Sequence, residues 1–152
     1  MRYIKANAAA LLILAVAACG NPDTPGGRAA DARHENFEDL GEAFKTIDDE
    51  FKKASPDLAA VATAAGKVEA ASQQLENWFP AGSSKGDGMR TDALQAVWDK
   101  PAEFKQAAAN FKLEAARFDA LAAAGDAGVM RAGLRGLGGA CKQCHDKFRK
   151  PE

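Results

Sequence analysis

The sequence predicts an all-α protein whose core is an antiparallel four-helix bundle. Apolar residues recur every three or four positions in four separate segments, whereas no segment alternates with the two-residue period of a strand. Breaks rich in Pro, Gly, Ser or Asp separate these segments. Most of the connections are short, and short connections place successive helices side by side in opposite directions.

The first half of the chain contains two of the predicted helices. The seam of the first helix consists of Phe37, Leu40, Phe44, Ile47 and Phe51. In the break that follows, Ser55 is suited to cap the next helix and Pro56 to occupy its first turn. The seam of the second helix consists of Leu58, Val61, Ala65, Val68 and Leu75.

The second half begins with a glycine-rich loop at 79–88 and a short helical stretch predicted at 92–98. Asp99 and Pro101 then indicate the start of the third helix, which Gly125 ends. The third seam consists of Phe104, Ala108, Phe111, Ala115, Phe118 and Ala122. The fourth seam follows Asp126 and consists of Met130, Leu134, Leu137, Cys141, Cys144 and Phe148.

The stretch Cys141-Lys142-Gln143-Cys144-His145 has the spacing of a c-type haem attachment sequence. On a helix its two thiols and its imidazole share one face. The alternatives are a structural disulfide, a redox CxxC and half of a zinc site. The sequence has no second Cys/His pair to complete a zinc site and no βαβ pattern around a redox motif. We therefore expect one haem c at one end of the bundle, bound covalently through Cys141 and Cys144, with His145 on the iron.

Antiparallel order brings aromatic residues to the same pole of the bundle as the haem motif. The residues expected there are Arg33, His34, Phe37, Trp78, Phe79, Phe104 and Phe148. A porphyrin needs a wide apolar slot, which these rings would line. Four glycines in the fourth helix, Gly133, Gly136, Gly138 and Gly139, indicate close approach of the haem to that backbone. The alternative is an irregular or broken start to the helix.

The N-terminus reads as an export signal. Arg2 and Lys5 precede an apolar run at 8–18 that is too short to span a bilayer, so residues 1–18 are predicted to be a signal peptide. The run ends at Val16-Ala17-Ala18-Cys19-Gly20, which resembles the lipobox of bacterial lipoproteins. We expect Cys19 to carry lipid and residues 19–30 to form a tether to the bundle at 31–150. The alternative is an ordinary signal peptide cleaved after Ala18.

These assignments use all three cysteines of the chain, so no disulfide is expected. Without residues 1–18 the chain has 18 Lys and Arg against 21 Asp and Glu, a formal charge of −3. That acidic balance argues against nucleic acid as a partner. The expected location is the periplasm, with the protein anchored to a bacterial membrane by Cys19. Gly20 rather than Asp after the cysteine favours the outer membrane in a Gram-negative cell.

The chain resembles cytochrome c′, the four-helix-bundle class of c-type cytochromes. The resemblance rests on the motif from Cys141 to Arg149, the segments 91–98 and 79–83, and Arg33 four residues before Phe37. It implies that Arg33 and Arg149 lie near the haem and its propionates, where a guanidinium suits a carboxylate. For each arginine the alternative is a solvated charge at a helix end.

The resemblance also gives Phe37 a specific meaning. Low-spin members of the family place a methionine at this position as the sixth iron ligand, and a phenylalanine has no lone pair to donate. A five-coordinate, high-spin iron is therefore expected, with His145 as the protein ligand. His34 and Met89 are the alternative sixth ligands.

Two functions follow from the resemblance. The first is one-electron transfer to a periplasmic or membrane redox partner. The second is binding of NO or CO on the open haem face, as a gas buffer. No residue reads as a catalytic acid, base or nucleophile, so the protein is not expected to be an enzyme, although His34 and Arg33 leave a weakly supported peroxidase alternative. If the CxxCH motif does not attach haem, the remaining interpretation is a structural lipoprotein. The family often forms homodimers through its first two helices, which makes a homodimer a further expectation.

Overall fold

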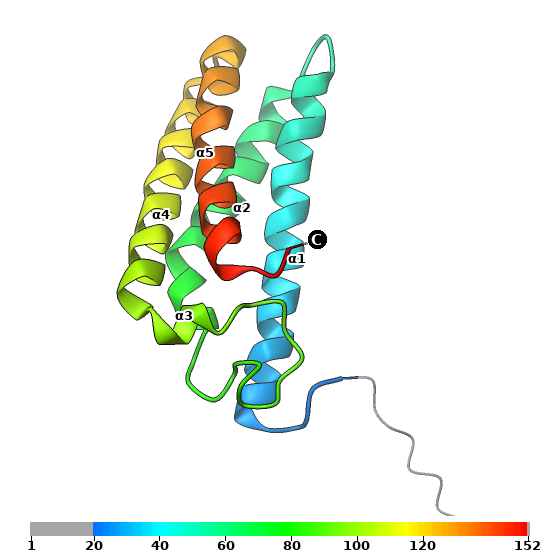
Figure 1. The fold of residues 1–152 in the computed structure, drawn as a ribbon. Helices are drawn as coiled ribbons and strands as arrows, with labels where there is room; N and C mark the ends of the chain where they lie inside the picture. The colour runs from blue at the N-terminus through cyan, green and yellow to red at the C-terminus, as the bar shows by residue number, and fades with distance from the viewer. Residues whose placement is uncertain (1–19, 152) are drawn as a thin grey trace, which may run out of the picture.

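The computed structural model describes residues 20–151, which form a bundle of four long helices with two short ones (Figure 1). The elements are α1 (Pro25–Lys52), α2 (Leu58–Gln74), the 3-10 helix η1 (Leu75–Trp78), α3 (Ala96–Asp99), α4 (Pro101–Ala124) and α5 (Ala127–Phe148). Residues 20–151 contain no strand, only an isolated antiparallel bridge between Ala93 and Arg149. The predicted all-α four-helix bundle is confirmed. The signal peptide at 1–18 and Cys19 lie outside the described residues.

The first helix starts earlier than predicted, inside the stretch interpreted as a tether. Thr24 caps α1 by accepting a hydrogen bond from the Gly27 amide, and Pro25 occupies the first turn. A Cβ on Gly26 would lie 2.0 Å from the carbonyl oxygen of Gly82, so the helix and the loop touch at a point where only glycine fits. The Pro and Gly residues that read as a linker are therefore a helix start and a close packing contact, and the tether prediction is wrong from Pro25 onward.

The remaining helix ends follow the sequence with two corrections. Asp57, not Ser55, caps α2, and its carboxylate accepts from the amides of Ala59 and Ala60. The short helix predicted at 92–98 forms only at Ala96–Asp99. Gly125, with φ of 77°, ends α4, and α5 begins directly after Asp126, as the sequence indicated; the side chain of Asp126 caps it.

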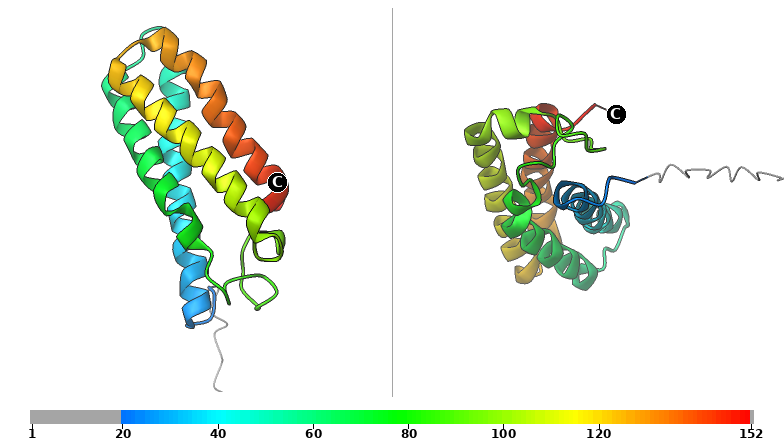
Figure 2. Two further views of the ribbon diagram at one scale, coloured as in Figure 1. Left: turned by 90° about the vertical axis from the view of Figure 1, so that its left-hand side faces the viewer. Right: turned by 90° about the horizontal axis from the view of Figure 1, so that it is seen from below.

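The core lies between helices that pack in the order α1, α2, α4 and α5. Its most deeply buried members are Phe118, Ile47, Met130, Leu137, Val61 and Val68. α1 and α5 do not pack closely against each other, unlike the other three pairs of neighbouring helices. Figures 1 and 2 show the four long helices side by side, and the left view of Figure 2 shows the end of α5 standing away from α1. None of the helices within residues 20–151 is both long and apolar enough to cross a bilayer.

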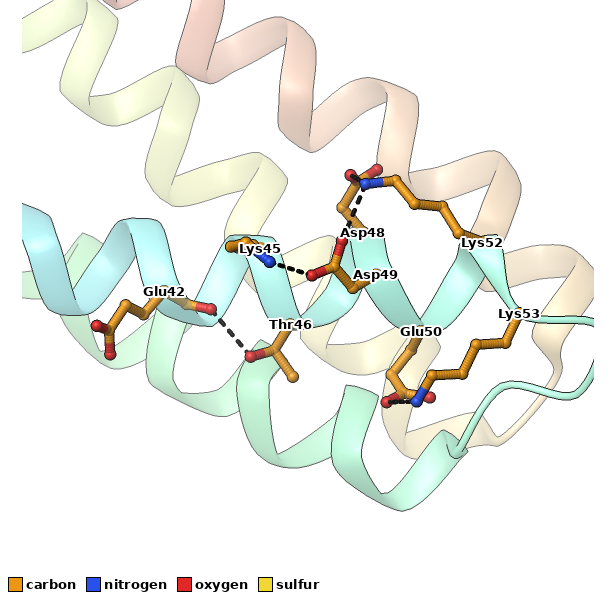
Figure 3. Close-up of polar contacts among 8 residues, drawn as sticks. All are labelled: Glu42, Lys45, Thr46, Asp48, Asp49, Glu50, Lys52 and Lys53. Carbon is orange, nitrogen blue, oxygen red and sulfur yellow. Dashed lines mark hydrogen bonds and ion pairs between the residues drawn. The ribbon is translucent and has the colours of Figure 1, made fainter.

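Ion pairs cover the C-terminal turns of α1 (Figure 3). The Lys52 ammonium lies 2.6 Å from a carboxylate oxygen of Asp48 and 2.9 Å from one of Asp49, which also pairs with Lys45. Hydrogen bonds from Lys45 and Lys52 lower the pKa of Asp49 to about 2. Exposed pairs of this kind contribute little individually to the free energy of unfolding, and protonation of Asp49 in acid removes its share.

Candidate functional site: the groove between α1 and α5

The groove lies between α1 and α5, which do not pack closely against each other. Its volume is about 540 Å³, and its walls are Phe44, Gly138, Cys141, Lys142, His145, Asp146, Arg149, Lys150 and Pro151. Phe44 is the contribution of α1, and the other residues come from the last turns of α5 and the tail that follows it. An open groove therefore runs beside the predicted haem motif.

The two cysteines face different parts of the interior. Cys141 lines the groove and packs against the main core, whereas Cys144 packs against a second apolar cluster of Val97, Phe104 and Phe148. Both are free thiols and half-buried. Burial, followed by the charge of Cys144, raises the pKa of Cys141 to about 11, and burial also raises the pKa of Cys144. The thiols are therefore protonated at neutral pH and behave as small apolar groups.

The predicted gathering of aromatic rings at this pole is present. Phe37 meets the ring of Trp78 edge to face, with 5.1 Å between centroids, and Phe79 at 6.1 Å. Phe79 contacts Phe104 at 4.8 Å, and Phe104 contacts Phe148 at 5.4 Å. This row of rings extends from α1 to the end of α5 and reaches Cys144, so one thiol lies beside a continuous apolar wall.

Arg33 is buried and holds the loop that follows η1. Its Nη1 donates to the carbonyl oxygen of Trp78 and to Oγ of Ser83, both at 3.0 Å. Its Nη2 donates to the carbonyl oxygen of Ser83 at 2.9 Å and to Oγ1 of Thr91 at 3.0 Å. The guanidinium also lies 4.9 Å from the centre of the Phe79 ring. Burial lowers the pKa of Arg33. Arg33 is thus neither a solvated helix-end charge nor a wall of the groove, and its four terminal N–H groups already have acceptors in the loop.

Arg149 occupies a different place. Two backbone hydrogen bonds pair the chain around it with the segment before α3: the Leu94 amide donates to Phe148 and the Lys150 amide donates to Asp92, both at 2.8 Å. This pairing directs the tail across the end of α5, where Arg149 lines the groove next to His145. Arg149 therefore lies beside the predicted iron ligand, and its role toward the haem stays a prediction.

Several predicted site residues do not reach the groove. Phe37 lies two turns before Phe44 on the same face of α1, and it is Phe44 that forms the wall. His34 is exposed and lies 3.4 Å from a carboxylate oxygen of Glu38. Met89 is buried in the loop. The sequence placed Phe44 on the apolar seam but gave no signal that it faces an opening.

The four glycines between positions 133 and 139 of α5 serve two separate purposes. A Cβ on Gly133 would lie 2.5 Å from Cδ1 of Leu121, and one on Gly136 would lie 2.6 Å from Oε2 of Glu114. These two glycines therefore allow α4 to approach α5 closely. Gly138 lines the groove, and a Cβ on Gly139 would meet nothing within 4 Å. The attribution of all four to haem was thus wrong for Gly133 and Gly136, and α5 is unbroken.

The groove fits a covalently bound haem. Two free thiols three residues apart match the two vinyl groups of the porphyrin, and the imidazole of His145 lies on the groove wall beside them. Gly138, one turn before Cys141, adds no side chain to that wall. Arg149 and Lys150 provide cations at the open end, where the propionates of a haem need partners.

A helical bundle with a CxxCH motif on the wall of such a groove defines a haem-binding, c-type bundle protein. The family model described as Cytochrome C' matches residues 28–149. The chain belongs to the cytochrome c′ family. Members of this family carry one covalently bound haem c, and haem c is therefore the cofactor of this chain.

Similarity to individual proteins supports this assignment. A cytochrome c′ from Pararhodospirillum photometricum is 34% identical over 111 residues, which are 72% of this chain and 86% of that protein. A cytochrome c′ from Rubrivivax gelatinosus is 43% identical over 72 residues, 47% of this chain and 54% of that protein. The chain thus spans about half the length of several curated relatives that it matches. The crystal structure of the Rubrivivax gelatinosus protein superposes with a TM-score of 0.75 at 31% identity, over 84% of this chain and 98% of that one.

Proposed function

We propose that this cytochrome c′ family protein transfers single electrons to a redox partner outside the cytoplasm. The observation that carries the proposal is the position of the CxxCH motif on the wall of the open α1–α5 groove. Cys141 and Cys144 would hold the haem through thioether bonds and His145 would bind its iron. The haem would supply a single reversible electron at its iron. No three His, Cys, Asp or Glu side chains within residues 20–151 gather as a metal site of another kind.

The chain's own residues would bind and shield the haem. The aromatic row from Phe37 to Phe148 excludes water on one side, and burial of this sort shifts a haem potential. The Arg33 network holds the loop at 79–91 against this row and so keeps the pole closed. Arg149 and Lys150 would neutralise propionates at the open side of the groove.

A second function, binding of NO or CO, is favoured by one specific comparison. A nitric oxide complex of a variant cytochrome c prime from Alcaligenes xylosoxidans superposes on this chain with a TM-score of 0.74 at 26% identity. If Phe37 faces the haem side opposite His145, it offers no ligand atom there and leaves that side to a small diatomic gas. Electron transfer and gas binding would then use the same haem.

One set of spectra tests the attachment and separates the two functions. Protein produced with a haem-attachment system should keep its colour on the polypeptide through acid–acetone extraction, because thioether bonds survive it. Colour that moves into the organic phase would contradict attachment at Cys141 and Cys144. A ferrous spectrum that changes on addition of CO supports gas binding. A reversible one-electron titration with no response to CO supports electron transfer only.

Homodimer formation through the first two helices stays a proposal. A second groove, of about 750 Å³, runs between α1 and α2 and is lined largely by alanines and polar residues, with Leu40 and Trp78. Sedimentation of the haem-loaded protein would give its mass directly. A single species at the monomer mass at high concentration would contradict the homodimer.

A further inference from the structure

The groove has a positively charged edge on α5. Arg131, Arg135 and Lys142 follow one another at intervals of four and seven residues, which keep them on one face of α5, and Arg149 follows directly after the end of the helix. Lys142 and Arg149 line the groove, and so does Lys150 in the tail. We call these five side chains the basic rim.

The basic rim faces α1 along the length of α5. The guanidinium of Arg131 lies 5.3 Å from the centre of the Phe51 ring at the far end of α1, so the rim continues beyond the groove along the opening between the two helices. Lys142 is paired with Asp146 at 2.7 Å. Arg135 and Lys150 are exposed and form no ion pair with any residue in 20–151. Arg135 and Lys150 therefore present their charge to the solvent.

Positive charge is concentrated here although the protein as a whole is acidic. Residues 127–152 carry six Lys and Arg against two Asp and Glu, whereas residues 1–126 carry 14 against 19. Helix α1, on the other side of the groove, has eight acidic residues and four Lys and Arg. A solvated helix surface would normally mix the two signs. Segregation of this kind creates a local field at the groove that is opposite in sign to the net charge.

We infer that the basic rim is the surface on which an acidic redox protein docks. This inference rests on the proposed electron-transfer function. Transient redox complexes bury little area and depend on complementary charge to bring the partner to the right place. A carboxylate-rich patch can be confined to the rim. A flat anionic membrane resting on it would also meet the acidic helix α1, which disfavours a lipid surface as the occupant.

Electron transfer with small charged oxidants tests the local field. The ferrous, haem-loaded protein is mixed with ferricyanide, an anion, or with tris(phenanthroline)cobalt(III), a cation. Raising the ionic strength from about 10 to about 200 mM should lower the rate of electron transfer to ferricyanide by about threefold or more. The rate with the cobalt complex should stay unchanged or rise. A ferricyanide rate that rises with salt, as the net negative charge alone would require, overturns the inference.

A pair of matched variants locates the charge. Arg135→Glu/Lys150→Glu reverses two rim charges without touching the CxxCH motif, and should abolish the ferricyanide salt effect. Lys105→Glu/Lys112→Glu makes the same change in net charge at exposed positions of α4, which line neither groove, and should retain it. Equal behaviour of the two variants would overturn the inference. Circular dichroism checks that both are folded.

Calorimetric titration with poly-L-glutamate gives a readout that needs no electron transfer. The wild type and the α4 variant should bind this acidic polypeptide at low salt, and the rim variant should bind it at least about tenfold more weakly. Binding to phosphatidylglycerol vesicles but not to poly-L-glutamate would overturn the protein partner in favour of a membrane. If neither oxidant reacts, the electron-transfer proposal itself fails. If both react with salt effects that follow the net charge, only the docking surface fails.

Discussion

Arg33 of α1 and Ser83 of the following loop are joined by two hydrogen bonds although 50 positions separate them in the chain. Both residues are buried, and no carboxylate lies among the acceptors of the guanidinium. A buried cation held by neutral oxygens is costly unless every donor is used. This pair therefore makes the conformation of the loop depend on one side chain.

Replacement of Arg33 should destabilise the protein strongly. Arg33→Met keeps the apolar stem but leaves the Trp78 and Ser83 carbonyls without their donors, and we expect a loss of about 3 kcal/mol in the free energy of unfolding. Arg33→Lys should recover only part of this, because an ammonium cannot reproduce the planar fork of donors. Urea denaturation measures both. Arg28→Met, at an exposed position in the first turns of α1, serves as the control, and an equal loss there would contradict the prediction.

The family resemblance predicts a high-spin iron that Phe37→Met would shift towards six-coordinate low spin, whereas Phe44 and not Phe37 lies on the groove wall. A thioether is flexible and can donate a lone pair, whereas the phenylalanine ring cannot. Optical and electron paramagnetic resonance spectra of the ferric protein would show the change. Phe44→Met is an informative comparison because the structure places Phe44 on the groove wall. Conversion by Phe44→Met but not by Phe37→Met would identify Phe44 as the residue opposite His145.

Cys19→Ser should release the protein from the membrane fraction. The prediction depends on the lipobox-like sequence ending at Cys19, because stable anchoring needs acyl chains on that thiol. Cell fractionation followed by immunoblotting would show the wild type with membranes and the variant in the soluble periplasmic fraction. A wild type that is already soluble would show that residues 1–18 form an ordinary signal peptide.

Acid should weaken the end of α1 through Asp49. Its folded-state pKa of about 2 lies below the value of about 3.9 expected for an unfolded aspartate, so its contribution is complete above about pH 4 and disappears as the pH falls towards 2. Denaturation midpoints measured between pH 6 and pH 2 should fall less for Asp49→Asn than for the wild type. Glu76→Gln, at an exposed position of η1, should show the same fall of the midpoint with pH as the wild type. If the midpoints of the wild type and Asp49→Asn fell equally between pH 6 and pH 2, the lowered pKa of Asp49 would be contradicted.

The sequence by itself determined the helices and the haem motif. Apolar spacing and end signals such as Pro101, Gly125 and Asp126 act over a few residues, so they predicted where α4 and α5 begin or end. The spacing of Cys141, Cys144 and His145 is equally local, which is why the residues alone were enough to recognise the attachment sequence. The early start of α1 was missed because Pro25 and Gly26 are as common in linkers as at helix starts, and only the contact with Gly82 distinguishes the two.

Only the tertiary structure decided what surrounds the motif. Each seam specifies which face of a helix is buried, but not which neighbouring helices remain apart, and the opening between α1 and α5 depends on the packing of the other three interfaces. The same packing brings Phe44 to the groove, Gly133 against Leu121, and Arg33 to a loop 50 residues away. These contacts join residues distant in the chain, and local spacing carries no information about which distant residues will meet.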